Sequence, residues 1–141
     1  MTQVDPNNES TFQVCVIKSK QSETKIPKKE IFQQLAKHQF SDEAQFAIKL
    51  ALEEALANAV KHGNAEDATK CVTIRFAITR EKAVFIIRDE GPWFVPEHIP
   101  DPTTTDRLQN PSGRGIMLIR AYMDKVQFRD DGREIYFEKY R

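Results

Sequence analysis

The apolar residues change their spacing near residue 70, and this change predicts helices packed against a sheet. Between Ser41 and Gly63 the apolar residues follow a helical period, which indicates one long amphipathic helix. Over residues 72–79 they alternate with more polar residues, as in a strand with one buried face. Residues 83–88 are almost continuously apolar. We therefore expect a central strand there, with both faces partly covered.

The rest of the chain adds shorter elements of the same two kinds. They are a strand over 12–17, a helix over 28–39, a helix that opens at Gly113, and a closing hairpin of 125–129 and 134–140. This pattern predicts an α+β two-layer sandwich, with a mixed, mostly antiparallel sheet and helices on one face. At 141 residues the chain has the length of one domain, which we assign to 11–141, after a flexible tail at 1–10.

Charge and hydropathy limit the partners that we expect. The chain has 21 basic and 21 acidic residues, without the clustered basic excess that binding to phosphate backbones needs, so direct contact with nucleic acid is not expected. No apolar run approaches the roughly 20 residues of a membrane span, and no signal segment opens the chain. We therefore expect no membrane contact and a cytoplasmic location.

Three short polar motifs stand at the ends of the predicted elements. They are Glu54 with Asn58 on the long helix, Asp89 with Gly91 after the central strand, and Gly113 with Gly115 at the start of the next helix. Glu54 and Asn58 are four residues apart, so both leave the same helix face. Taken singly, the motifs read as a solvated side-chain pair, a turn and an ordinary helix start.

Taken together, the three motifs have the chemistry of a site for ATP and Mg²⁺. A carboxylate at a strand end can accept a hydrogen bond from an amino group, and a nearby glycine lets a flat ring approach the backbone. A helix N-terminus opened by glycine offers free N–H groups to phosphates. A carboxylate and an amide on a facing helix can hold a hydrated cation.

The order and spacing of the motifs at 54–63, 88–91 and 112–116 resemble the Bergerat-type ATP-binding fold. That fold is shared by gyrase, histidine kinases and mismatch-repair ATPases. Within it, the short chain and the sequence at 111–124 are most similar to the anti-sigma-factor serine kinases of bacterial partner-switching systems. The resemblance covers residues 12–140, which is nearly the whole domain.

The resemblance implies a role for each motif residue. Glu54 would be the general base that accepts a proton from a serine or threonine hydroxyl of a protein substrate, and Asn58 would ligate Mg²⁺. Asp89 would accept a hydrogen bond from the adenine amino group, with Gly91 beside the ring. The triphosphate would lie against the start of the next helix, at Gly113, Arg114 and Gly115.

The adenine motif departs from the family's usual Asp-x-Gly-x-Gly pattern, because Trp93 occupies its last position and Pro92 precedes it. Trp93 either stacks on the nucleotide or anchors the following segment on the core. Residues 92–112 hold five of the seven prolines and no apolar period, so we expect them to form an ATP lid.

Two functions remain open at this point. The first is an ATP-dependent serine/threonine protein kinase, a transcription regulator of the anti-sigma-factor type that phosphorylates an anti-sigma-antagonist (STAS-type) domain. The second is a non-catalytic module that sequesters a sigma factor or antagonist, with nucleotide structural or absent. Glu54 together with Asn58 favours the kinase, because a binder needs no base, whereas Trp93 favours the module. The partner's identity and a homodimer also remain open.

Overall fold

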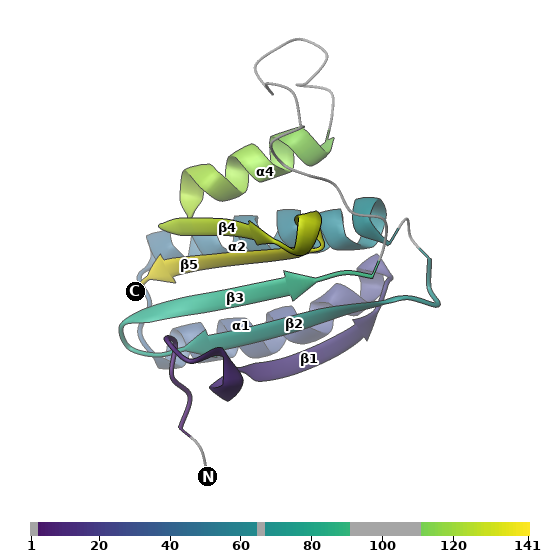
Figure 1. Ribbon diagram of the computed structural model, residues 1–141. Helices are drawn as coiled ribbons and strands as arrows, with labels where there is room; N and C mark the ends of the chain where they lie inside the picture. Colours follow the sequence, from purple (N-terminus) through teal and green to yellow (C-terminus); the bar gives the residue numbers. More distant parts are fainter. Residues whose placement is uncertain (1–2, 65–66, 91–110) are drawn as a thin grey trace.

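The computed structural model describes residues 3–64, 67–90 and 111–141, which form a helical layer on one face of a sheet (Figure 1). The sheet has the strand order β1-β2-β3-β5-β4, and each of these neighbouring pairs is antiparallel. Its strands are β1 (Gln13–Lys18), β2 (Cys71–Ile78), β3 (Lys82–Arg88), β4 (Lys125–Arg129) and β5 (Glu134–Tyr140). The predicted α+β two-layer sandwich is therefore confirmed.

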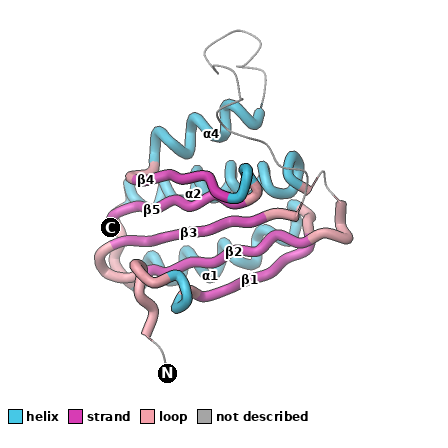
Figure 2. Tube along the Cα trace, viewed as in Figure 1, coloured by secondary structure: helices cyan, strands magenta, loops and turns pink. Residues whose placement is uncertain are grey.

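The helices α1 (Lys25–Lys37), α2 (Asp42–Ala57) and α4 (Pro111–Tyr122) lie on the same side of the sheet (Figure 2). Short 3₁₀ turns occur at Glu9–Thr11, Gln21–Thr24 and Asp130–Gly132. None of the helices in the described ranges is both long and apolar enough to cross a membrane.

Helix α1 ends two residues before the predicted position, and the backbone explains why. Gln39 adopts a φ of 60°, in the left-handed region that terminates helices. The N–H of Phe40 then donates to the carbonyl of Leu35 at 3.0 Å. At the other end α1 starts at Lys25, so that Pro27 lies in the first turn, where its missing N–H costs nothing.

The core lies between the two layers and is built on β3 and α2. The five residues from Ala83 to Ile87 are all buried, as the apolar run predicted. Phe85 packs on Phe137 of β5 with ring centroids 5.3 Å apart. The α2 side contributes the fully buried residues Ile48, Leu52 and Leu56. Each large apolar side chain buried in this way contributes about 1.5–3 kcal/mol, so α2 is held firmly against the sheet.

Helix α2 begins and ends in different ways. Ser41 caps its N-terminus, because its hydroxyl oxygen accepts the N–H of Ala44 at 3.0 Å, as predicted. After Ala57 the chain continues as a π-helical turn, Asn58–Gly63. In keeping with that wider turn, the N–H of Asn64 donates to the carbonyl of Ala59 at 2.9 Å. The π turn ends at Gly63, the residue where the sequence predicts the end of the helix, but the π turn itself was not anticipated. Such turns are frequent at functional sites.

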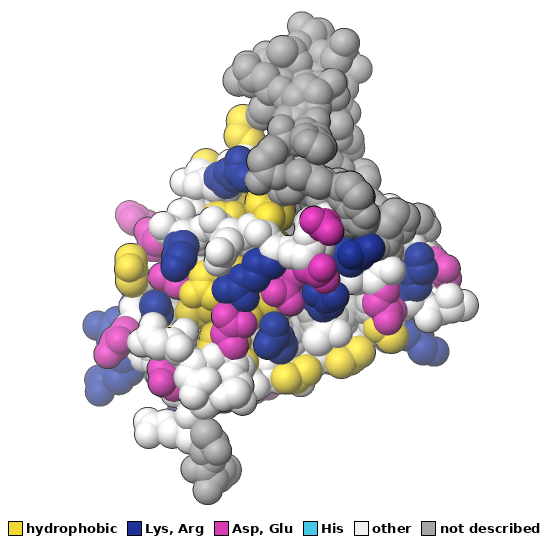
Figure 3. All heavy atoms as spheres, viewed as in Figure 1, with side chains coloured by type: hydrophobic (Ala, Val, Ile, Leu, Met, Phe, Trp, Pro, Cys, Tyr) yellow, Lys and Arg dark blue, Asp and Glu magenta, His cyan; other side chains and the backbone are white. Residues whose placement is uncertain are grey.

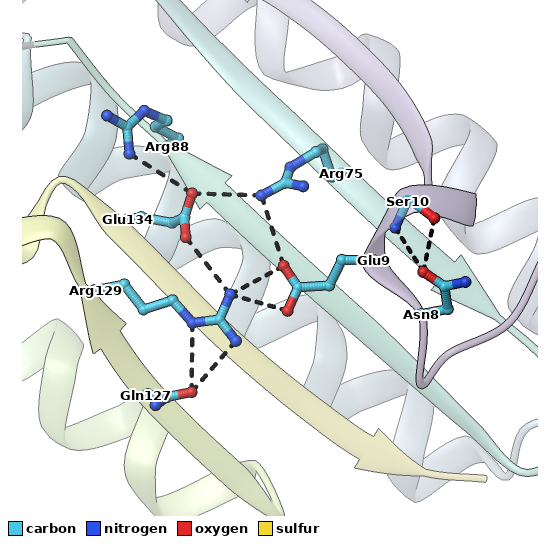
Figure 4. Close-up of polar contacts among 8 residues, drawn as sticks. All are labelled: Asn8, Glu9, Ser10, Arg75, Arg88, Gln127, Arg129 and Glu134. Carbon is cyan, nitrogen blue, oxygen red and sulfur yellow. Dashed lines mark hydrogen bonds and ion pairs between the residues drawn. The ribbon is translucent and has the colours of Figure 1, made fainter.

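The outer face of the sheet, away from the helices, carries alternating acidic and basic side chains (Figure 3). The strand register places Glu134 directly opposite Arg88 of β3 and Arg129 of β4. Its carboxylate lies 3.7 Å from Arg88 and 3.6 Å from Arg129, and 3.5 Å from Arg75 (Figure 4). Glu9 adds a further pair with Arg129 at 3.1 Å, which holds the N-terminal segment on this face.

Candidate functional site

Glu54 and Asn58 lie where α2 meets the first turns of α4. Both side chains are half-buried, and Gly115 of α4 sits directly against them. A Cβ at position 115 would lie 2.8 Å from Oε2 of Glu54 and 3.4 Å from Nδ2 of Asn58. Because the first distance is shorter than any ordinary contact, a side chain at position 115 would displace the Glu54 carboxylate, and glycine leaves the carboxylate where it lies. The structure therefore brings two of the three predicted motifs together.

The third motif joins the site through a small cavity. Asn58 and Asp89 line the same cavity of about 20 Å³, together with two buried alanines, Ala55 and Ala59. The alanines keep the helix surface thin beside the end of β3. A cavity of this size holds about one water molecule, so it accepts a bridging water or the edge of a ligand rather than a whole ring.

Asp89 is held in place by the turn between β4 and β5. It is buried, with 6% of its surface exposed, and its backbone N–H donates to the carbonyl of Arg133 at 2.9 Å. Asp130, Asp131 and Gly132 have φ values of 53°, 54° and 89°, and this left-handed turn carries the chain back to Arg133. The turn also supplies Gly132 and Arg133 to the wall of the cavity. The carboxylate therefore sits on a braced strand end.

The start of α4 is the third component. The helix begins at Pro111, two residues earlier than predicted, because proline is well suited to a first helical position. Gly113 and Arg114 thus lie in the first turn, whose backbone N–H groups have no partner within a helix. The side chain of Arg114 is outside the described part of the structure. So are Gly91, Trp93 and nearly all of the predicted lid at 92–112.

Sequence reasoning missed two further residues near the site. Asn64 is completely buried, and its side chain bonds to the backbone of two different segments. Glu90 is the middle residue of the Asp-x-Gly motif, and its side chain accepts a third hydrogen bond, from the backbone of Cys71. An asparagine after a glycine is most often a turn residue, so nothing in the local pattern distinguishes Asn64 from a solvated one.

The donor set of the site fits Mg²⁺ bound with a nucleotide. Asn58 supplies one amide oxygen, the hard ligand type that Mg²⁺ prefers, and phosphates would supply the remaining charged ligands. The N-terminus of α4 favours anions through its free N–H groups and its dipole. Glu54 is a carboxylate beside Asn58 at Gly115, and Asp89 is an acceptor in the wall of the cavity that Asn58 also lines. Gly115 keeps the Glu54 carboxylate beside Asn58, because a Cβ there would lie 2.8 Å from it.

Comparison with known proteins matches most of the chain to one domain family. The model of the histidine kinase-like ATPase domain matches residues 28–139. A serine-protein kinase RsbW of Bacillus licheniformis is 31% identical over 96 residues, which are 60% of this chain and 56% of that protein. The RsbW of Bacillus subtilis (strain 168) is 33% identical over 92 residues, 57% and 54% of the two chains.

A third relative is covered more completely. The serine-protein kinase RsbW of Oceanobacillus iheyensis is 32% identical over 108 residues, which are 72% of this chain and 68% of that protein. The matches to the two Bacillus proteins, by contrast, span only about half of their length.

Proposed function

This chain belongs to the histidine kinase-like ATPase domain family, and from that premise we propose that it is a Mg²⁺·ATP-dependent protein serine/threonine kinase. The observation that carries the proposal is the position of Gly115 against Glu54 and Asn58. A carboxylate, an amide and a helix start lie together there, and we assign them the roles of base, cation ligand and phosphate-binding site. A protein that only binds nucleotide has no need of the carboxylate there.

Each group has a defined task in phosphoryl transfer. The first turn of α4 would bind the phosphates through backbone N–H groups, and Asn58 would hold Mg²⁺, which would supply positive charge against the phosphates. Glu54 accepts the proton of the substrate hydroxyl while the oxygen of that hydroxyl forms a bond to the γ-phosphorus. The bond from that phosphorus to the β,γ-bridging oxygen breaks, and ADP leaves with the electron pair. Most of the rate enhancement comes from positioning, so few residues have to be reactive.

Asp89 sets which base is bound. A buried carboxylate that accepts a hydrogen bond favours a ring with an exocyclic amino group, as in adenine, over one with a carbonyl oxygen at that place. Its strand end is braced by the carbonyl of Arg133, so the acceptor does not need to be ordered when the ligand arrives. A fixed acceptor of this kind supports ATP as the phosphoryl donor.

A groove between α1 and α2 supports a protein as the phosphoryl acceptor. It measures about 410 Å³, has Phe32 in its wall and Glu53 at one side, and is surrounded by the side chains of Lys25, Lys28, Lys29 and Lys49. None of these lysines forms an ion pair within the described residues, whereas Arg75, Arg88 and Arg129 on the outer sheet face are all paired. We therefore propose that an acidic segment of the partner lies in this groove.

The partner that we propose is an anti-sigma-antagonist domain of the STAS type, with a sigma factor as a second ligand of the same chain. The family resemblance and the serine-protein kinase names of the relatives support this choice. Lys49 and Glu53 of the groove belong to α2, the helix that carries Glu54, so the proposed docking surface and the proposed base share one helix.

Two measurements test the proposal. The full chain is titrated with ATP by calorimetry, with and without Mg²⁺, and is then incubated with γ-labelled ATP and STAS-domain proteins of its own organism. We expect Mg²⁺-dependent ATP binding and label on a serine or threonine of one STAS protein. Binding of ATP without transfer to any of them would favour the sequestering module, and no binding of ATP would refute both nucleotide-dependent functions.

A further inference from the structure

Asn64 ties together two segments that do not neighbour it in the sequence. Its side-chain Nδ2 donates to the carbonyl of Cys71 at the start of β2, at 3.0 Å. Its Oδ1 accepts the N–H of Glu90 just beyond the end of β3, at 2.8 Å. The residue has no exposed surface, so both bonds are shielded from water. A buried amide that satisfies both of its partners in this way is a rigid link.

Glu90 closes the same arrangement from the other side. Its Oε2 accepts the N–H of Cys71 at 2.6 Å. The carbonyl of Cys71 thus accepts a hydrogen bond from Asn64, and the N–H of Cys71 donates one to Glu90. The N–H of Glu90 in turn donates to Asn64. The three residues form a closed ring of hydrogen bonds, which we call the Asn64–Cys71–Glu90 clamp.

The clamp joins the two chain segments that carry Asn58 and Asp89. Asn64 directly follows the π-helical turn that begins with Asn58, the proposed Mg²⁺ ligand. Glu90 directly follows Asp89, the proposed adenine acceptor. The helix end and the strand end are therefore joined through a side chain, as well as through the packing of α2 on the sheet.

We propose that Asn64 and Glu90 are positioning residues, which set the distance between Asn58 and Asp89 so that one nucleotide engages both. The inference rests on the proposed function, because it assumes that adenine and Mg²⁺ bind at these two places. A ligand held at two points gains affinity only while the spacing of the points matches it. Weakening the clamp should therefore lower the affinity that a nucleotide gains by binding at Asn58 and Asp89 at once.

This role differs from plain stabilisation in what it predicts for fragments of the ligand. Adenosine engages only the Asp89 end, whereas Mg²⁺·ADP engages both ends. If the clamp sets the spacing, its loss leaves adenosine affinity nearly unchanged and reduces the extra affinity of Mg²⁺·ADP. If the clamp only stabilises the fold, the affinities for the two ligands fall together or not at all.

Glu90→Ala and Glu90→Gln make a matched pair for the experiment. Glu90 is exposed, so neither substitution empties the core. Alanine removes the acceptor for the N–H of Cys71, whereas glutamine keeps an oxygen there and removes only the charge. Asn64→Asp is a third variant, which keeps the acceptor for Glu90 but loses the donor to Cys71.

We measure the affinities for adenosine by NMR titration and for Mg²⁺·ADP by calorimetry, on the full chain in each form. In Glu90→Ala we expect the affinity for Mg²⁺·ADP to fall by about tenfold, the lower end of the effect of losing a residue that orients a metal ligand. Adenosine affinity should stay within about twofold of wild type, because its contacts are unchanged. Glu90→Gln should restore most of the loss, and Asn64→Asp should resemble Glu90→Ala.

The failures of the inference and of the proposed function are distinguishable. If wild type does not bind Mg²⁺·ADP, the proposed function is wrong and the inference fails with it. If wild type binds and Glu90→Ala binds equally well, or loses both ligands in proportion, only the positioning role is overturned. Thermal unfolding of each variant shows whether it is folded, and an unfolded Asn64→Asp leaves the Glu90 pair to decide.

Discussion

Gly115 of α4 lies so close to Glu54 of α2 that a Cβ at position 115 would be 2.8 Å from the Glu54 carboxylate. Two helices whose starting points are far apart in the chain thus meet at a residue without a side chain. The contact has a chemical consequence, because it places the N-terminal turn of one helix beside the carboxylate and amide of the other. The groups of this site, and those of the groove between α1 and α2, can each be altered separately.

Gly115→Ala should separate stability from phosphoryl transfer. Alanine raises the helix propensity of α4 by about 1 kcal/mol, so the midpoint of thermal unfolding should hold or rise slightly. The new Cβ displaces the Glu54 carboxylate, and a displacement of about 1 Å costs on the order of 10²-fold in rate. Calorimetry of unfolding and the rate of label transfer test the two effects. A wild-type transfer rate would show that Glu54 is not needed where it now lies.

Glu54→Gln should leave ATP affinity unchanged and reduce transfer by about 10²–10⁴-fold, the usual range for a lost general base. The amide keeps the size of the side chain but does not accept the proton. Glu43→Gln is the matched control, because it makes the same change at an exposed residue of the same helix outside the groove, and it should transfer at the wild-type rate. If Glu54→Gln transfers phosphate as fast as the control variant, Glu54 is not the general base.

Asp89→Asn should weaken ATP binding by one to two powers of ten. The substitution can face the adenine amino group with a donor instead of an acceptor, and a lost charge-assisted hydrogen bond costs about 1.5–3 kcal/mol. The fold should persist, because the bond from residue 89 to the carbonyl of Arg133 is made by the backbone. Asp131→Asn, in the exposed turn, is the control. An unchanged dissociation constant in a calorimetric titration would remove Asp89 from the adenine site.

Lys28→Glu combined with Lys49→Glu should weaken recognition of the protein substrate but not of ATP. Two reversed charges at the groove turn attraction into repulsion for an acidic segment, and we expect KM for the partner to rise by about tenfold at low salt. The control combines Lys18→Glu with Lys37→Glu, two exposed lysines outside the groove that give the same change of net charge. An equal rise of KM in the control would point to overall charge rather than the groove.

Much of the fold could be predicted because local pattern governs it. Alternation over β2 and the continuous apolar run of β3 correspond to strands with one and two buried faces, as the structure confirms. The hairpin of β4 and β5 has the predicted bounds, because Asp130, Asp131 and Gly132 are residue types that tolerate a positive φ. The end of α1 differs from the prediction because Gln39 adopts a left-handed conformation, which glutamine seldom does.

The candidate site was predicted only as separate motifs. Sequence spacing puts Glu54 and Asn58 on one helix face, since that depends only on the helical period. Their meeting with Gly115 depends on how α2 and α4 pack on the same sheet, which no local pattern records. The chemistry of the motifs still pointed to a shared ligand. An acceptor for an amino group, a phosphate-binding helix start and a cation ligand can bind one nucleotide only if they lie close together.

The kind of each element and its approximate position were therefore readable from the chain alone, because they depend on neighbours within one or two turns or along one strand. The burial of Asn64 and its bonds to Cys71 and Glu90 were not, because they require the antiparallel register of β2 and β3 to bring the two strand ends together. The same holds for the cavity shared by Asn58 and Asp89. Contacts between distant segments are decided by the packing of whole layers, and only the folded chain contains that information.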